Sequence, residues 1–210
     1  ALQSYMKRYG ANVHLNNQLV EIDGPAQTAV FSTKDADGVE HRQSHKFDMI
    51  HVCPPQIAPD FVASSELADQ AGWLEVDQYS LRHTRFDNVW GLGDVMNTPN
   101  AKTMAAVRKQ VPVVAENIIR SMAGQEANMA YDGYGSCPLT VERGKIVLAE
   151  FGYGGKLLPT FPTWMLDGTH ATRAAWILKA NMLPGVYWHA MLKGREWLAA
   201  PHPRDEVAAA

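Results

Sequence analysis

The sequence predicts an α/β fold: a small antiparallel meander, a strand–turn–helix unit, and an α+β C-terminal region with amphipathic helices. In the middle of the chain, an apolar pair leads into Gly91-Leu92-Gly93-Asp94, which predicts a buried strand ending in a tight turn. Residues Lys102–Met122 follow, with apolar side chains at steps of three and four, as in an amphipathic helix. Near the N-terminus, short alternating stretches separated by turn residues predict the meander.

The composition limits the range of functions. The chain has 210 residues, of which 46% are hydrophobic, so it can form one large domain or parts of two. A net charge of −3 argues against nucleic acid as the main partner. Two cysteines are too few for a disulfide scaffold, and no signal peptide or membrane-spanning apolar run is evident.

The first half of the chain predicts short elements without obvious chemistry. Leu2–Gly10 has the pattern of a helix that ends on a glycine, and a helix tail at the first residue suggests part of a longer protein. The predicted strands are 13–15, 19–22, 28–33, 47–53, 73–76 and 88–90. A short helix is expected from Ser64 or Ser65 to Ala71, and a solvated turn at 82–85. The histidines lack metal-ligand spacing, so we expect no metal site.

Gly93, Asp94 and Lys102 are the candidate cofactor-binding residues. The N-terminus of a helix attracts anions and polarised oxygens, and a carboxylate accepts hydrogen bonds from hydroxyl groups. Together these features suit the polyol linker and ring of a nucleotide cofactor better than a bare phosphate, which Asp94 would repel. Lys102 is either a solvent-facing lysine or a donor to the group that the helix end attracts.

Two cysteines remain open to different interpretations. Cys53 ends a predicted strand before Pro54-Pro55 and is either a buried small hydrophobe or a reactive thiol. Cys137 lies in Gly-Ser-Cys-Pro, within a stretch rich in aromatics and turn formers, which predicts a turn. A thiol on a turn beside an electron-accepting ring can attack sulfur or the ring, although a merely structural cysteine is the alternative.

The last fifty residues contain four of the six tryptophans, at 164, 176, 188 and 197. Because indole prefers water–lipid boundaries, this distribution suggests a membrane surface. Two helical pieces, 174–180 and 186–192, are expected on either side of a break at Pro184-Gly185. Their basic residues Lys179, Lys193 and Arg195 suit lipid headgroups, and the alternative is a dimer or domain interface.

Several motifs together resemble one family of flavoproteins. Asp87–Asp94 is similar to the second flavin-contact motif of two-dinucleotide-domain oxidoreductases. Four further segments make the resemblance specific to sulfide:quinone oxidoreductases of the mitochondrial and bacterial type. These segments are His51–Pro55, Lys102–Val107, Tyr131–Leu139 and Leu148–Phe151, with Thr160-Phe161-Pro162 after them. The resemblance extends from about residue 1 to about residue 195, and the tyrosine-rich cysteine segment is its most specific part.

The resemblance implies roles for individual residues. Asp94, on the Gly93 turn, resembles the aspartate that holds the ribityl chain of FAD, and Lys102 resembles a lysine that contacts the flavin. Cys137 resembles one of two redox cysteines, which take sulfur from sulfide as a persulfide and send electrons through FAD to a membrane quinone. Phe151 and Tyr153 are candidates for lining the quinone pocket.

The resemblance also implies partners and a location. They are sulfide, quinone, a small-molecule sulfur acceptor and a membrane surface docked by the C-terminal helices, with a homodimer as a further expectation. The location is peripheral to the bacterial cytoplasmic membrane or the mitochondrial inner membrane. The segments divide as 1–87, a remnant of an NAD-like dinucleotide-binding domain; 88–124, the FAD-domain strand–turn–helix; and 125–210, the redox-cysteine and membrane-docking region.

The chain departs from the family pattern in two respects. It lacks a Gly-x-Gly-x-x-Gly adenine-nucleotide motif and the second redox cysteine, so we expect FAD to bind these residues weakly, or not at all, without the rest of a full-length enzyme. Two alternatives remain at this point: a related NADH:quinone flavoprotein, and a non-catalytic fragment that only self-associates.

Overall fold

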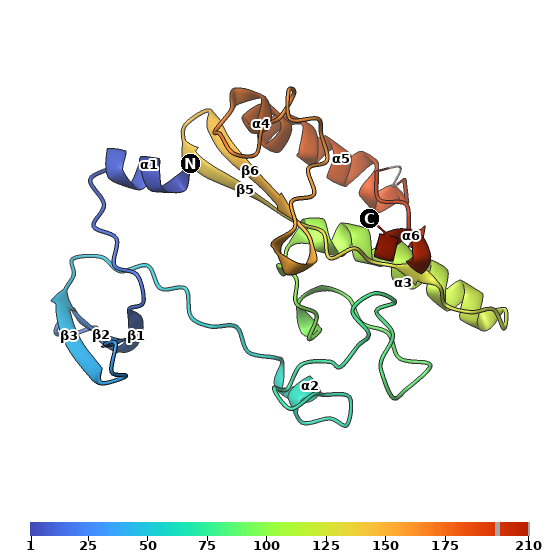
Figure 1. Cartoon of the computed structure of the whole chain (residues 1–210), viewed down its shortest axis with the longest axis horizontal. Coiled ribbons are helices and arrows are strands. Elements are labelled where there is room, and N and C mark those ends of the chain that lie inside the picture. The colour runs from blue at the N-terminus through green and yellow to red at the C-terminus, as the bar shows by residue number, and fades with distance from the viewer. Residues whose placement is uncertain (196–197, 210) are drawn as a thin grey trace. The chain divides into compact units, whose positions relative to one another are not determined.

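The computed structural model describes residues 1–195 and 198–209, in two compact units, Leu2–Gln56 and Ile57–Ala210 (Figure 1). The smaller unit begins with helix α1 (Leu2–Arg8), which ends at Gly10, where φ is +65°. The expected glycine C-cap is confirmed, since the N–H groups of Gly10 and Ala11 bond to carbonyls of the last helical turn.

A three-stranded antiparallel meander forms the rest of this unit. Strands β1 (Gln18–Asp23), β2 (Thr28–Lys34) and β3 (Glu40–Lys46) pair in chain order, so the predicted meander is confirmed. The turn residues Asp35–Gly38 connect β2 to β3, with Gly38 at φ +80°. The strands expected at 13–15 and 47–53 were wrong, because neither stretch pairs with a described strand of this unit.

The larger unit begins with irregular chain. The short helix α2 (Asp60–Ala63) precedes the predicted helix at 64–71, which was wrong. Ser65 and Asp69 instead bond their side chains to nearby backbone N–H groups, which stabilises turns rather than a helix. The strands predicted at 73–76 and 88–90 are reduced to isolated bridges, of which Leu74–Met96 is parallel. Among the described residues this bridge is the one parallel pairing, and all named sheets are antiparallel.

Helix α3 (Met104–Met122) is the longest element, and Gly124 follows it at φ +70°, as expected. Its buried face is formed by Ala106, Gln110, Val113, Val114 and Asn117. The predicted apolar face, formed by Met104, Val107, Val111, Val114, Ile118 and Met122, was only partly right, because Met104, Val111 and Met122 are exposed. Two amides, Gln110 and Asn117, lie on the buried face.

The C-terminal part of the larger unit packs as a hairpin with helices beside it (Figure 1). Strands β5 (Gly135–Glu142) and β6 (Lys145–Phe151) pair antiparallel, followed by the 3-10 turn η2 (Tyr153–Gly155). One helical segment then runs through α4 (Arg173–Ile177), the π-turn η3 (Leu178–Met182), α5 (Leu183–His189) and η4 (Met191–Lys193). Pro184 and Gly185 lie inside α5, so the break expected there was wrong; proline is tolerated in a first helical turn.

The C-terminus returns to the middle of the unit. Strand β7 (His202–Pro203) pairs with β4 (Met129–Ala130), and helix α6 (Arg204–Ala209) follows it. The main core joins Leu81, Met96, Val113 and Tyr131, all at most 2% exposed. A second cluster joins Ile146 and Leu148 of β6 to Leu166 and to Ala175 of α4.

His83 is a buried histidine in the segment that was expected to be a solvated turn. It is 3% exposed; its Nε2 lies 3.0 Å from the Leu67 carbonyl oxygen, and its Nδ1 accepts the N–H groups of Arg85 and Phe86. Since Nδ1 accepts two bonds, Nε2 carries the proton and donates.

We expect His83→Leu to destabilise the larger unit by about 2–3 kcal/mol, because it leaves one carbonyl and two N–H groups without partners. Urea unfolding followed by fluorescence measures this. The same change at exposed His189 is the control and should cost no more than about 0.5 kcal/mol. Equal effects of the two substitutions would contradict the assigned role of His83.

Candidate functional site

The Gly91–Asp94 turn contacts helix α3 and packs against the side chains of Leu74 and Met96. A Cβ on Gly91 would lie 2.6 Å from the Leu74 side chain and 2.8 Å from that of Met96, so only glycine allows this close packing. Gly93 begins a 3-10 turn, Gly93–Val95, at φ +75°, a conformation that favours glycine. The turn thus requires glycine at two positions for two different reasons.

Asp94 is exposed at this turn, and the start of α3 is capped elsewhere. The Thr103 hydroxyl accepts the Ala106 N–H at 3.2 Å, as an N-cap residue does. Because Thr103 provides the cap, the Asp94 carboxylate is not needed to complete the helix. It can therefore accept hydrogen bonds from a bound polyol.

Lys102 also binds this turn, through its side-chain ammonium. Its Nζ donates to the carbonyl oxygens of Asp94 and Met96, the latter at 2.6 Å, and lies 3.9 Å from the centre of the Trp73 ring. Burial lowers the pKa of Lys102, and the Asp94 charge opposes that shift. The solvent-facing alternative is therefore wrong: Lys102 is a half-buried donor that stabilises the Gly93–Val95 turn.

Cys137 lies in strand β5 and not in the turn that its sequence suggested, because seven of the eight residues of β5 pair with β6. Pro138 is tolerated there since β5 is an edge strand of a two-stranded sheet. The thiol is half-buried and forms no disulfide. Its strand is nonetheless close to the start of α3, since a Cβ on Gly135 would lie 3.2 Å from that of Ala101, beside Lys102.

Alternation along the hairpin decides what shares a face with Cys137. Side chains two residues apart on a strand point the same way, as do directly opposed residues. Cys137 opposes Ala149, and Gly135 opposes Phe151, so these four residues share one face. The Phe151 ring lies 3.6 Å from the Cβ position of Gly135. The face of the hairpin that carries Cys137 and Phe151 therefore lies next to the Ala101–Lys102 segment.

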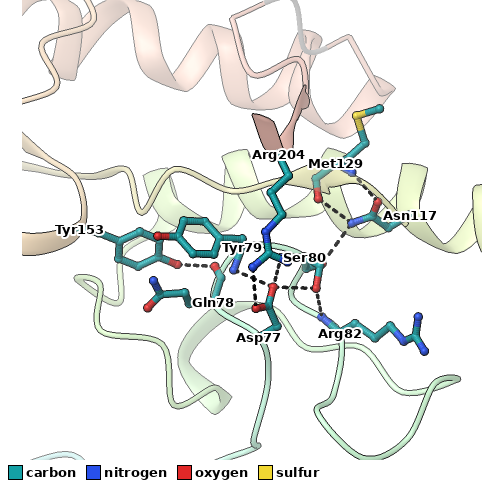
Figure 2. Close-up of polar contacts among 9 residues, drawn as sticks. All are labelled: Asp77, Gln78, Tyr79, Ser80, Arg82, Asn117, Met129, Tyr153 and Arg204. Carbon is teal, nitrogen blue, oxygen red and sulfur yellow. Dashed lines mark hydrogen bonds and ion pairs between the residues drawn. The ribbon is translucent and has the colours of Figure 1, made fainter. Parts of the chain in front are cut away.

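Tyr153 has a different environment from Phe151. Its hydroxyl donates to the Gln78 carbonyl oxygen at 2.5 Å (Figure 2). Its ring contacts those of Tyr79 and Tyr131 edge-on. A Cβ on Gly133 would lie 2.4 Å from the Tyr153 ring. Its contacts are thus with the core of the larger unit, and contact of Phe151 or Tyr153 with a quinone stays a prediction.

The other face of the hairpin carries a buried carboxylate. Glu150 is 9% exposed, and its Oε1 accepts from the hydroxyls of Tyr134 at 2.6 Å and Thr160 at 2.5 Å. Burial, with the neighbouring Glu150, raises the pKa of Tyr134 to about 12. The phenol therefore stays neutral and remains a donor to this carboxylate.

Sequence reasoning missed two residues that join these parts. Gln110 is 1% exposed and accepts the Gly93 N–H at 2.8 Å, while Tyr131, also 1% exposed, bonds the segment before β5. The available signal was the register of Gln110 with Ala106 and Val113, which places a polar side chain on the buried face of α3.

The C-terminal helical segment and the loop before it expose large apolar side chains. The exposed members are Trp164, Met165, Ile177, Met182, Leu183, Trp188 and Leu192. We call these seven residues the C-terminal apolar surface; Trp197 lies outside the described residues. Lys179 donates to the Pro138 carbonyl oxygen at 2.9 Å and the Thr140 hydroxyl at 2.8 Å, so it ties η3 to β5, in contrast to the expected headgroup contact. Among the described residues, none of the helices has the length and hydropathy to cross a bilayer.

Several curated proteins that are clearly similar in sequence to this chain are sulfide:quinone oxidoreductases. The chain is 38% identical over 194 residues to the mitochondrial sulfide:quinone oxidoreductase of Mus musculus and 40% identical over 195 residues to that of Dictyostelium discoideum. Each match covers 92% of this chain but only 42% and 41% of the relative, so the chain spans less than half the length of these proteins. No profile of a known protein family matches the sequence.

Solved structures agree at the level of the fold. The sulfide:quinone oxidoreductase of Aquifex aeolicus superposes with a TM-score of 0.70 at 15% identity, covering 96% of this chain and 49% of the other. A chain in the mitochondrial ATP synthase structure of Tetrahymena thermophila gives a TM-score of 0.66 at 24% identity, covering 94% and 45%. At these identities the likeness concerns the fold alone, and it is consistent with part of an FAD-oxidoreductase fold.

Lys102→Met should loosen the Gly93–Val95 turn, because two backbone carbonyls lose a charged donor. We expect backbone amides of residues 93–97 to exchange hydrogen about tenfold faster, measured by mass spectrometry. Lys145→Met at the β5–β6 turn is the control, since its ammonium pairs with Glu142 away from this turn. Unchanged exchange at 93–97 in Lys102→Met would contradict the assigned contacts.

Proposed function

Because the chain is homologous to sulfide:quinone oxidoreductases, we propose that the protein containing it oxidises sulfide and passes the electrons to a quinone. The observation that supports this most directly is the placement of Cys137. Its strand face adjoins the Ala101–Lys102 segment, beside the turn that carries Asp94. A sulfur atom, a cation and an acceptor carboxylate are thus supplied by three neighbouring elements.

The residues present fit FAD at the start of α3. The exposed Asp94 carboxylate suits the hydroxyls of its ribityl chain, and Lys102 supplies positive charge to the ring end. FAD, when bound, supplies the two-electron acceptor that links sulfide to quinone. The positive end of α3 and Lys102 stabilise negative charge at that place.

Cys137 carries the sulfur chemistry in this proposal. Hydrosulfide attacks the Cys137 sulfur of a disulfide; Cys137 keeps the added sulfur as a persulfide, and the partner cysteine leaves as a thiolate. The partner cysteine is not assigned in this chain. Cys53 lies in the smaller unit and is exposed, and no sulfur role is proposed for it.

The C-terminal apolar surface is the proposed contact with the membrane in which the quinone dissolves. Tryptophan and aliphatic side chains exposed on this helical segment and the loop before it favour the boundary between headgroups and acyl chains. Docking there would make the protein peripheral to the membrane. A homodimer contact through the same surface is the competing expectation.

Cys137→Ser should abolish the bleaching of bound flavin by sulfide in the full-length protein, because the disulfide that hydrosulfide attacks can no longer form. Stopped-flow absorbance measures bleaching, and mass spectrometry of the wild type should find one added sulfur atom on Cys137. Cys53→Ser is the matched control and should bleach at the wild-type rate. Reduction by NADH but not by sulfide would instead support the NADH:quinone alternative.

Trp188→Ser should weaken binding to phosphatidylglycerol-containing vesicles about fivefold, since an exposed indole is lost. Co-sedimentation with vesicles measures it. Ile119→Ser on α3 is the control, because the side chains of Ile119 and Trp188 are both 61% exposed. Equal losses in the two variants, or a change in oligomeric state with vesicle binding intact, would contradict the membrane assignment.

A further inference from the structure

Gln110 connects the Asp94 turn to the interior of the larger unit. Its side-chain carbonyl accepts the Gly93 N–H at 2.8 Å, although it lies 17 residues further along the chain. The amide group of the same side chain is within reach of the Tyr131 hydroxyl as a hydrogen-bond donor. With 1% exposure, Gln110 has no water available to replace either partner. The contacts that hold Tyr131 in place therefore also oppose movement of the Gly93 peptide.

Tyr131 is held by three segments at its hydroxyl. That group donates to the Tyr134 carbonyl oxygen at 2.5 Å and accepts from the Asn100 amide at 3.0 Å, besides its bond to Gln110. Burial raises the pKa of Tyr131, so the phenol keeps its proton and stays a donor. Tyr134 immediately precedes β5, so this bond fixes where the strand bearing Cys137 begins.

The continuous path is therefore Gly93, Gln110, Tyr131 and Tyr134, and we call it the buried link. It begins next to Asp94, at the proposed flavin-contact turn, and ends three residues before Cys137. Each of its side chains has a partner on both sides, and a buried network of this kind resists displacement of any member. A link needed only for stability would not have to end at both reactive elements.

We propose that Gln110 and Tyr131 are positioning residues that hold the flavin-contact turn and the cysteine-bearing strand at a fixed separation. The inference rests on the proposed function and adds to it. Neither residue needs to touch substrate or cofactor, since both act through the backbone of Gly93 and Tyr134. The separation matters because transfer between a sulfur atom and an acceptor ring depends steeply on their geometry.

The test uses the full-length protein with FAD. Gln110→Leu keeps the volume and removes both bonds; Tyr131→Phe keeps the ring and removes only the hydroxyl. We expect Gln110→Leu to raise the FAD dissociation constant about tenfold and to slow sulfide-dependent flavin bleaching about tenfold. Tyr131→Phe should change both in the same direction, and the double variant should be no worse than Gln110→Leu, because both break one path.

Asn117→Leu is the matched control. Asn117 is also a buried amide on the inner face of α3, but it binds Ser80 and Met129 and not the Gly93 turn (Figure 2). It should lower the melting temperature while leaving the FAD dissociation constant and bleaching rate within about twofold of wild type, once folded protein is compared.

Two outcomes would overturn the proposal. One is that Gln110→Leu and Asn117→Leu shift the FAD constant and bleaching rate equally. The other is that Tyr131→Phe, which is expected to fold, changes neither quantity. Failure of the proposed function would give a different result: sulfide would not bleach the flavin even in the wild-type protein.

Discussion

Two buried side-chain amides on one face of α3 hold together a unit that has little regular sheet. Gln110 and Asn117 are seven residues apart, which places them on the same helical face. Gln110 binds the turn at Gly93, and Asn117 binds the backbone of Ser80 and Met129. Buried backbone groups must find partners, and in irregular chain these amides supply them where a sheet ladder would otherwise do so.

The sequence pattern correctly predicted helices and strands whose formation depends on residues close together in the chain. It failed for strands whose formation depends on pairing with a distant segment. The α3 helix and the meander follow from periodicity and turn residues within a few positions. The strands expected at 47–53 and 73–76 have suitable residues, but a strand forms only when another strand pairs with it. The same reason places Cys137 in a strand despite its turn-like sequence, because β6 supplies seven paired positions.

The candidate site was predictable in residue type and not in orientation. Gly93, Asp94 and Lys102 were identifiable from a glycine turn before an amphipathic helix. That Lys102 would reach back to the carbonyls of Asp94 and Met96 depends on the path of the intervening loop, which no spacing rule gives. Gln110 was missed because a polar residue in an apolar register contradicts the pattern used to find the core, and such conflicts are frequent at functional sites.

In the β5–β6 hairpin, side chains alternate between the two faces, and this places the Glu150 carboxylate and the Cys137 thiol on opposite faces. Ser136 opposes Glu150 on one face, and Cys137 opposes Ala149 on the other. In the proposed function, a carboxylate beside Cys137 would repel the incoming hydrosulfide anion, since like charges repel. Glu150 is instead directed to Tyr134 and Thr160, and the face with Cys137 adjoins the segment that carries Lys102. A shift of one residue in the β5–β6 register would exchange these faces, so the pairing itself sets the charge around the sulfur.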